Sequence, residues 1–136
     1  MLPILIDSGI IVAYYDNSDP WFAKTRKFFD DSRAQFVTTE PCATEVMWLL
    51  QANRLTQNEF LSDLAKGLYK CEPLKTADFA RIAELNAKYS DFEADYPDLS
   101  LIAISERLDI PRVASLDQDF SIYRRYGKKR FERVFP

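Results

Sequence analysis

Residues 2–9 read Leu-Pro-Ile-Leu-Ile-Asp-Ser-Gly, a short apolar run that stops abruptly at an aspartate and a turn. Such an isoleucine-rich run is typical of a strand buried on both faces of a parallel sheet. A second run, Arg112 to Leu116, also ends directly before an aspartate, Asp117. Since the carboxyl ends of parallel strands meet at one edge of a sheet, Asp7 and Asp117 are expected to converge if their strands are near neighbours. Each can alternatively cap a following helix.

Strand-like and helix-like segments alternate over the rest of the chain. This alternation predicts an α/β fold with a mostly parallel central sheet and helices on both faces. Asp19-Pro20 is expected to begin one helix, and Thr56 with Glu59 has capping-box spacing at the start of another. The predicted strands are 2–6, 36–38, 68–74, 112–116 and 131–135, and the predicted helices are 10–15, 19–33, 41–53, 56–67, 76–89 and 98–108.

Length and composition narrow the possible functions. The 136 residues, 47% hydrophobic and 29% charged, suit a single globular domain over residues 1–136. The chain has no histidine, which excludes Ser-His-Asp and Cys-His nucleophile systems. Its two cysteines are too few for a disulfide framework and favour a reduced, cytoplasmic protein. No segment approaches the ~20 apolar residues that span a bilayer, so no membrane association is expected.

Carboxylates, of which the chain has 21, are then the first candidates for an active site. Asp98 begins an apolar helix, where it is either a functional acid or the helix cap. On a helical wheel Glu45 lies in the middle of the most apolar stripe of its helix, which consists of Pro41, Cys42, Trp48, Leu49 and Ala52. A buried carboxylate is costly unless it is protonated, paired with a cation such as an arginine, or bound to a metal.

Several carboxylates in one place repel each other, and a divalent cation removes this conflict. Ligation by oxygen alone favours Mg²⁺ or Mn²⁺ over zinc or copper. Such an ion lowers the pKa of a bound water and neutralises charge on a phosphodiester. An acid-rich site without histidine therefore favours phosphodiester hydrolysis.

Four stretches, residues 4–8, 38–46, 95–103 and 114–120, resemble in order and spacing the four motifs of the PIN-domain ribonuclease family. Within that family they are most similar to the toxins of bacterial VapBC-type toxin–antitoxin pairs. The resemblance implies that four acids form a catalytic metal site, namely Asp7, Glu45, Asp98 and Asp117. It also implies that Ser8 and Ser115 orient ligands or water, with Asp95 and Asp119 as auxiliary acids.

The resemblance further implies a PIN-like sandwich, Mg²⁺- or Mn²⁺-dependent endoribonuclease activity on single-stranded RNA, a homodimer and a neutralising antitoxin. One position departs from the family pattern. Pro97 stands directly before the third acid, where family members often carry alanine. Proline restricts the residue before it and favours a helix start, so a small shift of Asp98 is expected.

Basic residues concentrate in the C-terminal segment. Residues 124–136 carry six Lys and Arg against one Glu, whereas residues 1–123 carry a net charge of −8. Because acids alone repel a phosphate chain, this segment is expected to bind RNA. The residues assigned to RNA binding are Arg124, Arg125, Lys128, Lys129 and Arg130. The alternative is a solvated, solubilising end.

Three other functions stay open from the sequence. The chain can be an RNA-processing nuclease outside any toxin system. It can be a catalytically silent protein-binding module that uses Trp21, Phe28 and Phe29, although their spacing is that of an ordinary core helix. A phosphotransfer domain with Asp7 as acceptor is disfavoured, because no lysine follows the strand at 112–116.

Overall fold

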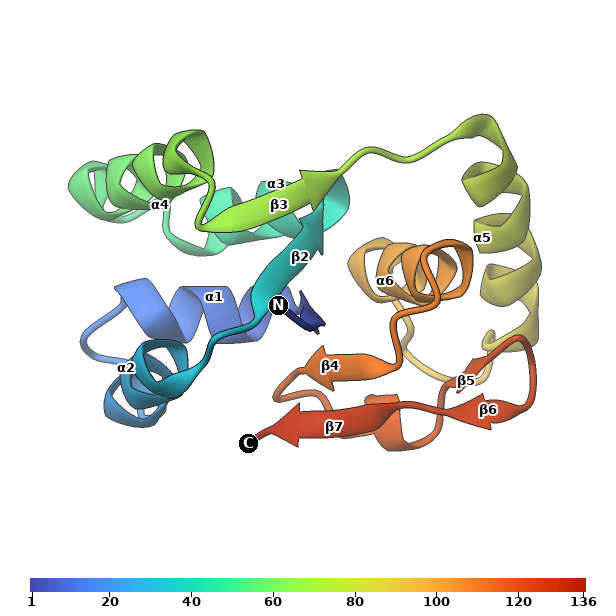
Figure 1. Ribbon diagram of the computed structural model, residues 1–136. Coiled ribbons are helices and arrows are strands. Elements are labelled where there is room, and N and C mark those ends of the chain that lie inside the picture. The colour runs from blue at the N-terminus through green and yellow to red at the C-terminus, as the bar shows by residue number, and fades with distance from the viewer.

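The computed structural model describes all 136 residues and is organised by one five-stranded parallel sheet in the order β3-β2-β1-β4-β7 (Figure 1). A separate antiparallel hairpin, β5–β6, precedes the last strand. The predicted α/β fold with a mostly parallel sheet is confirmed. The strands are β1 (Pro3–Ile6), β2 (Gln35–Thr39), β3 (Tyr69–Glu72), β4 (Arg112–Ala114), β5 (Arg124–Arg125), β6 (Lys129–Arg130) and β7 (Glu132–Phe135).

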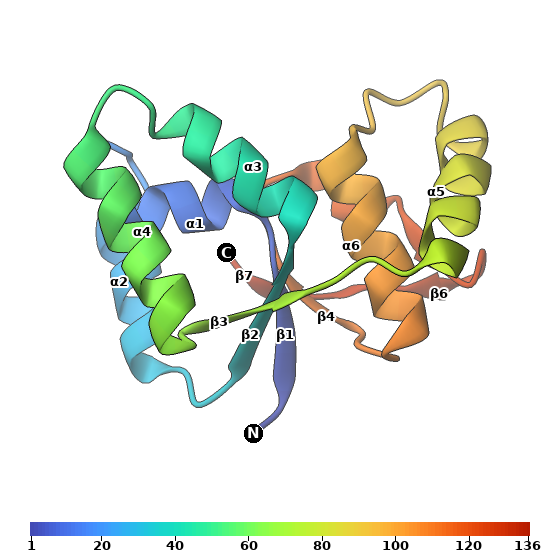
Figure 2. The same cartoon turned by 90° about the horizontal axis from the view of Figure 1, so that it is seen from above.

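Helices cover both faces of the sheet, with α1, α2 and α4 on one side and α5 and α6 on the other (Figure 2). None of them has the length and apolar character needed to cross a bilayer. The helices are α1 (Ser8–Tyr15), α2 (Phe22–Asp31), α3 (Glu40–Leu49), α4 (Arg54–Lys66), α5 (Thr76–Lys88), α6 (Tyr96–Arg107) and the 3-10 helix η1 (Gln118–Ser121).

The strand period of two divides the core into two layers. In β1, Leu5 packs into a cluster with α5 and α6, whereas Ile4 and Ile6 pack with the helices on the opposite face. Phe36 and Val37 of β2 divide between the same two clusters. A strand buried on both faces holds its C-terminal end in a fixed position, which is what a site at that end requires.

Some helix ends differ from prediction. The Asp19 carboxylate accepts from the backbone N–H of Trp21 at 2.8 Å in a tight turn, and α2 begins only at Phe22. Asn53 caps α4 by accepting from Thr56 N at 3.2 Å, so the helix starts before the predicted capping box. In both cases a short polar side chain accepts from a backbone N–H two or three residues ahead. The helix that follows therefore starts at a different residue from the one predicted.

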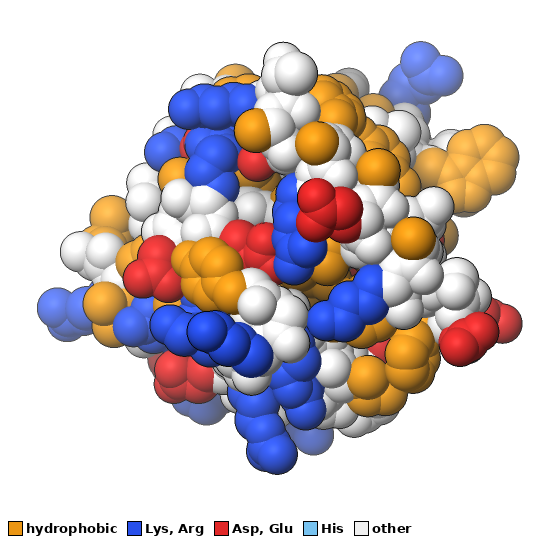
Figure 3. All heavy atoms as spheres, turned by 90° about the vertical axis from the view of Figure 1, so that its right-hand side faces the viewer, with side chains coloured by type: hydrophobic (Ala, Val, Ile, Leu, Met, Phe, Trp, Pro, Cys, Tyr) orange, Lys and Arg blue, Asp and Glu red, His pale blue; other side chains and the backbone are white.

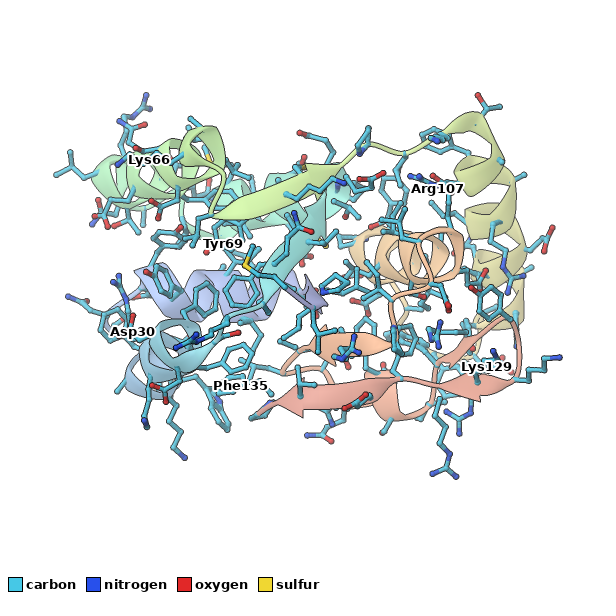
Figure 4. The ribbon with its side chains drawn as sticks, viewed as in Figure 1. Asp30, Lys66, Tyr69, Arg107, Lys129 and Phe135 are labelled. Carbon is cyan, nitrogen blue, oxygen red and sulfur yellow. The ribbon has the colours of Figure 1, made fainter.

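The aromatic residues considered for a protein interface pack against other rings of the fold, and none of them is fully exposed. Phe29 is buried, and Phe28 stacks on Phe135 with 4.7 Å between ring centroids. Trp21 meets the same ring edge-on at 6.1 Å. Phe135 and Tyr69 both lie on the side of the sheet that α1 and α2 cover (Figure 4). This arrangement favours the amphipathic-helix explanation over an exposed docking surface.

Candidate active site

The sheet order brings the acidic motifs to one edge. The central strand β1 has β2 on one side and β4 on the other, so the chain changes direction across the sheet between β1 and β4. Asp7 follows β1, α3 follows β2, and Ser115 follows β4. The Asp7 backbone N–H also donates to the Ala114 carbonyl at 3.0 Å, which joins two of these strand ends directly. Ligands of open parallel sheets bind at such a switch point.

Asp7 is held rigidly at the centre of this edge. Its side chain is 5% exposed. One carboxylate oxygen accepts from the backbone N–H of Ser8 at 2.7 Å, and the other accepts from the Ser115 hydroxyl at 2.7 Å. Asp7 is therefore the N-cap of α1, as the capping alternative predicts. Its side chain is also held by Ser115, which directly follows β4.

Glu45 reaches the same place from α3, because the Ser8 hydroxyl donates to its carboxylate. The prediction that Glu45 is buried in an apolar stripe is wrong. Trp48 and Leu49, which belong to that stripe, are 67% and 52% exposed, and Glu45 is half-buried. The face of α3 that packs inward carries Cys42, Ala43, Val46 and Leu50. Glu45 lies at the border of this face and forms no ion pair with an arginine.

Asp98 is a buried acid that does not cap its helix. Asp95 is the N-cap of α6, and its carboxylate accepts from the backbone N–H of Asp98 at 3.1 Å. The Asp98 side chain, in the first turn and 5% exposed, is left to accept from the Tyr123 hydroxyl at 3.0 Å. Pro97 occupies the first turn of α6, where a proline is tolerated. No local pattern in the sequence indicates Tyr123, whose contact with Asp98 spans 25 residues.

Asp117 comes from the loop after β4 and is linked to Asp7 through Ser115. The Ser115 oxygen accepts from the backbone N–H of Asp117 at 3.0 Å while its hydroxyl donates to Asp7. The Asp117 carboxylate accepts from Asp119 N at 2.9 Å and so caps η1. Ser115 thus contacts both the Asp7 carboxylate and the Asp117 backbone. Asp119 is half-buried beside Asp117. The pKa of Asp119 is raised, mainly by burial and secondly by the charge of Asp117.

Burial and mutual repulsion disfavour the charged forms of the two buried acids of this site, Asp7 and Asp98. Burial is the main reason why the pKa of Asp7 is raised to about 6, and the charges of Glu45 and Asp117 add to it, against the hydrogen bonds from Ser115 and Ser8. Burial likewise raises the pKa of Asp98 to about 9, with contributions from the charges of Asp7, Asp95 and Asp117. Carboxylates from four separate elements thus share one electrostatic environment.

The donor set suits a hard divalent cation. Asp7 and Asp98 are buried acids that offer only oxygen donors, and neither forms a salt bridge with a lysine or arginine. As the side chains stand, no three acids or cysteines are close enough to ligate one ion. A cation would be the missing countercharge that allows these carboxylates to approach each other.

The fold and this acidic edge define a class of protein. A family model described as PIN domain matches residues 4–126, and the chain belongs to the PIN domain family. Ribonuclease VapC26 of Mycobacterium tuberculosis is 24% identical to it over 131 residues, which cover 94% of this chain and 97% of that protein. The crystal structure of Mycobacterium tuberculosis VapC20, a Sarcin-Ricin loop cleaving toxin, has a TM-score of 0.81 at 15% identity, covering 88% of this chain and 93% of that chain.

The basic segment is only partly available to RNA. Arg125 is 6% exposed and donates to the Asp109 carboxylate at 3.0 Å, so its assignment to RNA binding is corrected to a structural role. Arg124 uses its guanidinium to donate to the backbone carbonyls of residues 121–123. Lys128, Lys129 and Arg130 are exposed on the hairpin. Figure 3 shows Lys and Arg side chains gathered across the face that carries α5 and this hairpin.

Arg125→Met is expected to destabilise the fold by about 1–2 kcal/mol, because it removes a hydrogen-bonded charge and leaves the methylene packing. The salt dependence of RNA binding should not change, since the guanidinium does not face solvent. Urea unfolding and RNA titrations at several salt concentrations measure the two effects. Arg130→Met is the matched control, and equal stability of the two variants would contradict the structural role.

Proposed function

We propose that this chain is a metal-dependent endoribonuclease that cleaves single-stranded RNA and is the toxin of a toxin–antitoxin pair. Membership of the PIN domain family and similarity to a ribonuclease and to an RNA-cleaving toxin support the ribonuclease activity. The single observation that carries the proposal is the meeting of Asp7, Glu45, Asp98 and Asp117 at one edge of the sheet. A group of acids of this kind, two of them buried and none paired with a cation, suits a metal-dependent hydrolase better than a silent binding module.

In this proposal Asp7, Glu45, Asp98 and Asp117 hold Mg²⁺ or Mn²⁺. When bound, the ion supplies an activated water and neutralises charge that develops on the phosphodiester. Ser8 bridges Asp7 and Glu45, and Ser115 bridges Asp7 and the Asp117 loop, so both serines orient ligands. Asp95 fixes the first turn of α6, and Asp119 adds negative charge beside Asp117.

The ribonuclease proposal is tested with purified protein and a pool of single-stranded RNAs. Cleavage is expected in Mg²⁺ or Mn²⁺, loss of cleavage in EDTA, and recovery when Mn²⁺ is added back. Cleavage that persists in EDTA would contradict metal dependence. Absence of cleavage under all conditions, with folded protein, would contradict the activity itself.

The exposed basic residues of the hairpin are proposed to hold the RNA backbone. Changing Lys128, Lys129 and Arg130 to Gln should weaken RNA binding and reduce the magnitude of the salt slope by about 2, since each phosphate contact on a single strand contributes ~0.7. Fluorescence anisotropy in EDTA at several salt concentrations measures this change. The control replaces three exposed cations on α2 and α4, Lys24, Arg54 and Lys66, with Gln. Equal slopes for the two triple variants would remove the hairpin from the RNA path.

The proposal also includes a homodimer and an antitoxin partner, as in VapBC-type pairs. Light scattering of the purified chain measures the oligomeric state, for which twice the mass of 15.8 kDa is expected. An adjacent short gene whose product suppresses RNA cleavage supports the toxin assignment. If no neighbouring product inhibits the enzyme, an RNA-processing nuclease becomes the better description.

A further inference from the structure

An apolar groove opens directly beside the acidic site. Its volume is about 720 Å³, and its lining includes Glu45, Trp48, Leu74, Phe79, Tyr96 and Pro97. The lining residues come from α3, the start of α6, the start of α5 and the connection between β3 and α5. Figure 2 shows α3 and α6 next to each other, with this connection crossing α6 on its way to α5. A groove of this size is in the range that binds small organic groups.

The groove is continuous with the acidic site. Glu45 lines the groove and also accepts from Ser8, which binds Asp7. Tyr96 and Pro97 line the groove and immediately precede Asp98 in the first turn of α6. A group in the groove therefore lies next to a phosphodiester bound by the four acids.

Three aromatic side chains on the lining of the groove are exposed. Trp48 is 67% exposed, Phe79 is 51% exposed and Tyr96 is 46% exposed. No lysine or arginine lines the groove, and its charged residues are Glu40 and Glu45. The lining therefore repels a phosphate but offers flat apolar faces to an uncharged ring. Stacking on such faces is how proteins hold the bases of single-stranded nucleic acids.

We propose that this groove binds an unpaired nucleobase of the RNA substrate, adjacent to the reacting phosphate and stacked on Trp48, with Tyr96 and Phe79 as further contacts. The proposal rests on the proposed ribonuclease function and adds where the base beside the cleaved bond is held. A paired base has both faces covered by its neighbours in the duplex, so the nucleotide beside the cleaved bond must be unpaired. In this arrangement the aromatic groove holds the base, and the cationic hairpin holds the phosphate backbone. The continuity of the groove with the acids that would hold the reacting phosphate argues for RNA over a protein segment as the occupant.

Kinetics test the contribution of the ring. Trp48→Ala should lower kcat/KM for single-stranded RNA roughly tenfold, mainly through KM, because one stacked base is lost. Trp48→Phe should recover most of the activity. Leu61→Ala, which removes an exposed apolar side chain from α4, is the control and should behave as wild type. If wild type cleaves RNA and Trp48→Ala cleaves it equally well, the groove proposal is overturned and the ribonuclease function stands.

Fluorescence tests the stacking directly and does not need cleavage. The chain has two tryptophans, so Trp21→Phe leaves Trp48 as the single reporter. In EDTA, single-stranded RNA should quench this fluorescence, whereas an abasic RNA of equal length should not. Absence of quenching, or equal quenching by the abasic strand, would overturn the proposal. Shielding of Trp48 from acrylamide that increases with protein concentration would identify the groove as an interface between two copies, which also overturns it.

Discussion

Asp98→Asn is expected to reduce RNA cleavage by at least about 100-fold and, without metal, to make the folded chain more stable. Cleavage is lost because an amide is a poor ligand for Mg²⁺ or Mn²⁺ compared with a carboxylate. Stability rises because burial, together with the charges of Asp7, Asp95 and Asp117, disfavours the ionised carboxyl in the folded chain, and the amide cannot ionise. The amide oxygen can still accept from the Tyr123 hydroxyl, so the one hydrogen bond to this side chain is kept.

The sign of this effect follows from the pKa values. Because the pKa of Asp98 is raised from 3.8 to about 9 in the folded chain, the folded state holds its proton more tightly than the unfolded state does. Stability therefore falls as pH rises from about 4 to about 9, and the asparagine variant escapes this loss. At pH 7.5 in EDTA the variant should melt roughly 5 °C higher than wild type. At pH 4 the difference should nearly vanish.

Two variants control this prediction. Asp91→Asn, in the exposed loop before α6, makes the same change in net charge and should alter neither melting temperature nor cleavage. Asp7→Asn should also lose cleavage but gain less stability, because its carboxylate accepts from both Ser8 N and Ser115 Oγ and an amide cannot replace both acceptors. A lower melting temperature for Asp98→Asn in EDTA would show that burial and repulsion do not destabilise the charged form of this acid.

Stabilisation by Mn²⁺ is expected to increase steeply with pH. A metal needs the deprotonated carboxylates, whereas the pKa of Asp7 is about 6 and that of Asp98 about 9. Binding must therefore displace protons, and the apparent affinity should rise between pH 6 and pH 9. Over the same range the metal-free chain becomes less stable. The difference in the free energy of unfolding between metal-bound and metal-free protein therefore increases for both reasons.

Differential scanning calorimetry across pH 6 to 9, with and without Mn²⁺, measures this difference. The shift in melting temperature should grow with pH in wild type and be small throughout in Asp98→Asn. The Asp7 carboxyl, with its pKa moved from 3.8 to about 6, contributes about 3 kcal/mol between these two pH values at ~1.4 kcal/mol per pH unit, so the increase between pH 6 and pH 9 comes mainly from Asp98. A shift independent of pH would contradict the displacement of protons from these two acids.

The strand ends were predictable from the sequence because they depend on local patterns. The apolar run before Asp7 and the run before Asp117 are strands β1 and β4, and these strands are neighbours in the sheet. Parallel topology then brings the two aspartates to one edge without further information. Asp98 was singled out for a different local reason, because it lies at the start of an apolar helix, which is α6.

Burial on α3 and the partners of single side chains were not predictable. A helical wheel shows which residues share a face, but α3 packs at the border of two clusters, and only tertiary contacts select Cys42 and Val46 over Trp48 as the buried residues. The sequence grouped Arg125 with the other basic residues of the C-terminal segment. In the structure Arg125 is buried and donates to the Asp109 carboxylate. Contacts of this kind form between segments that are distant in the sequence, so the local spacing of residues does not predict them.

The most direct test of the shared metal site is anomalous diffraction from a crystal of the wild-type chain grown or soaked in Mn²⁺. A strong anomalous peak is predicted among the carboxylates of Asp7, Glu45, Asp98 and Asp117, with no peak there in Asp98→Asn. A fully loaded crystal with no peak at this edge of the sheet, or with its only peak at other residues, would contradict the account.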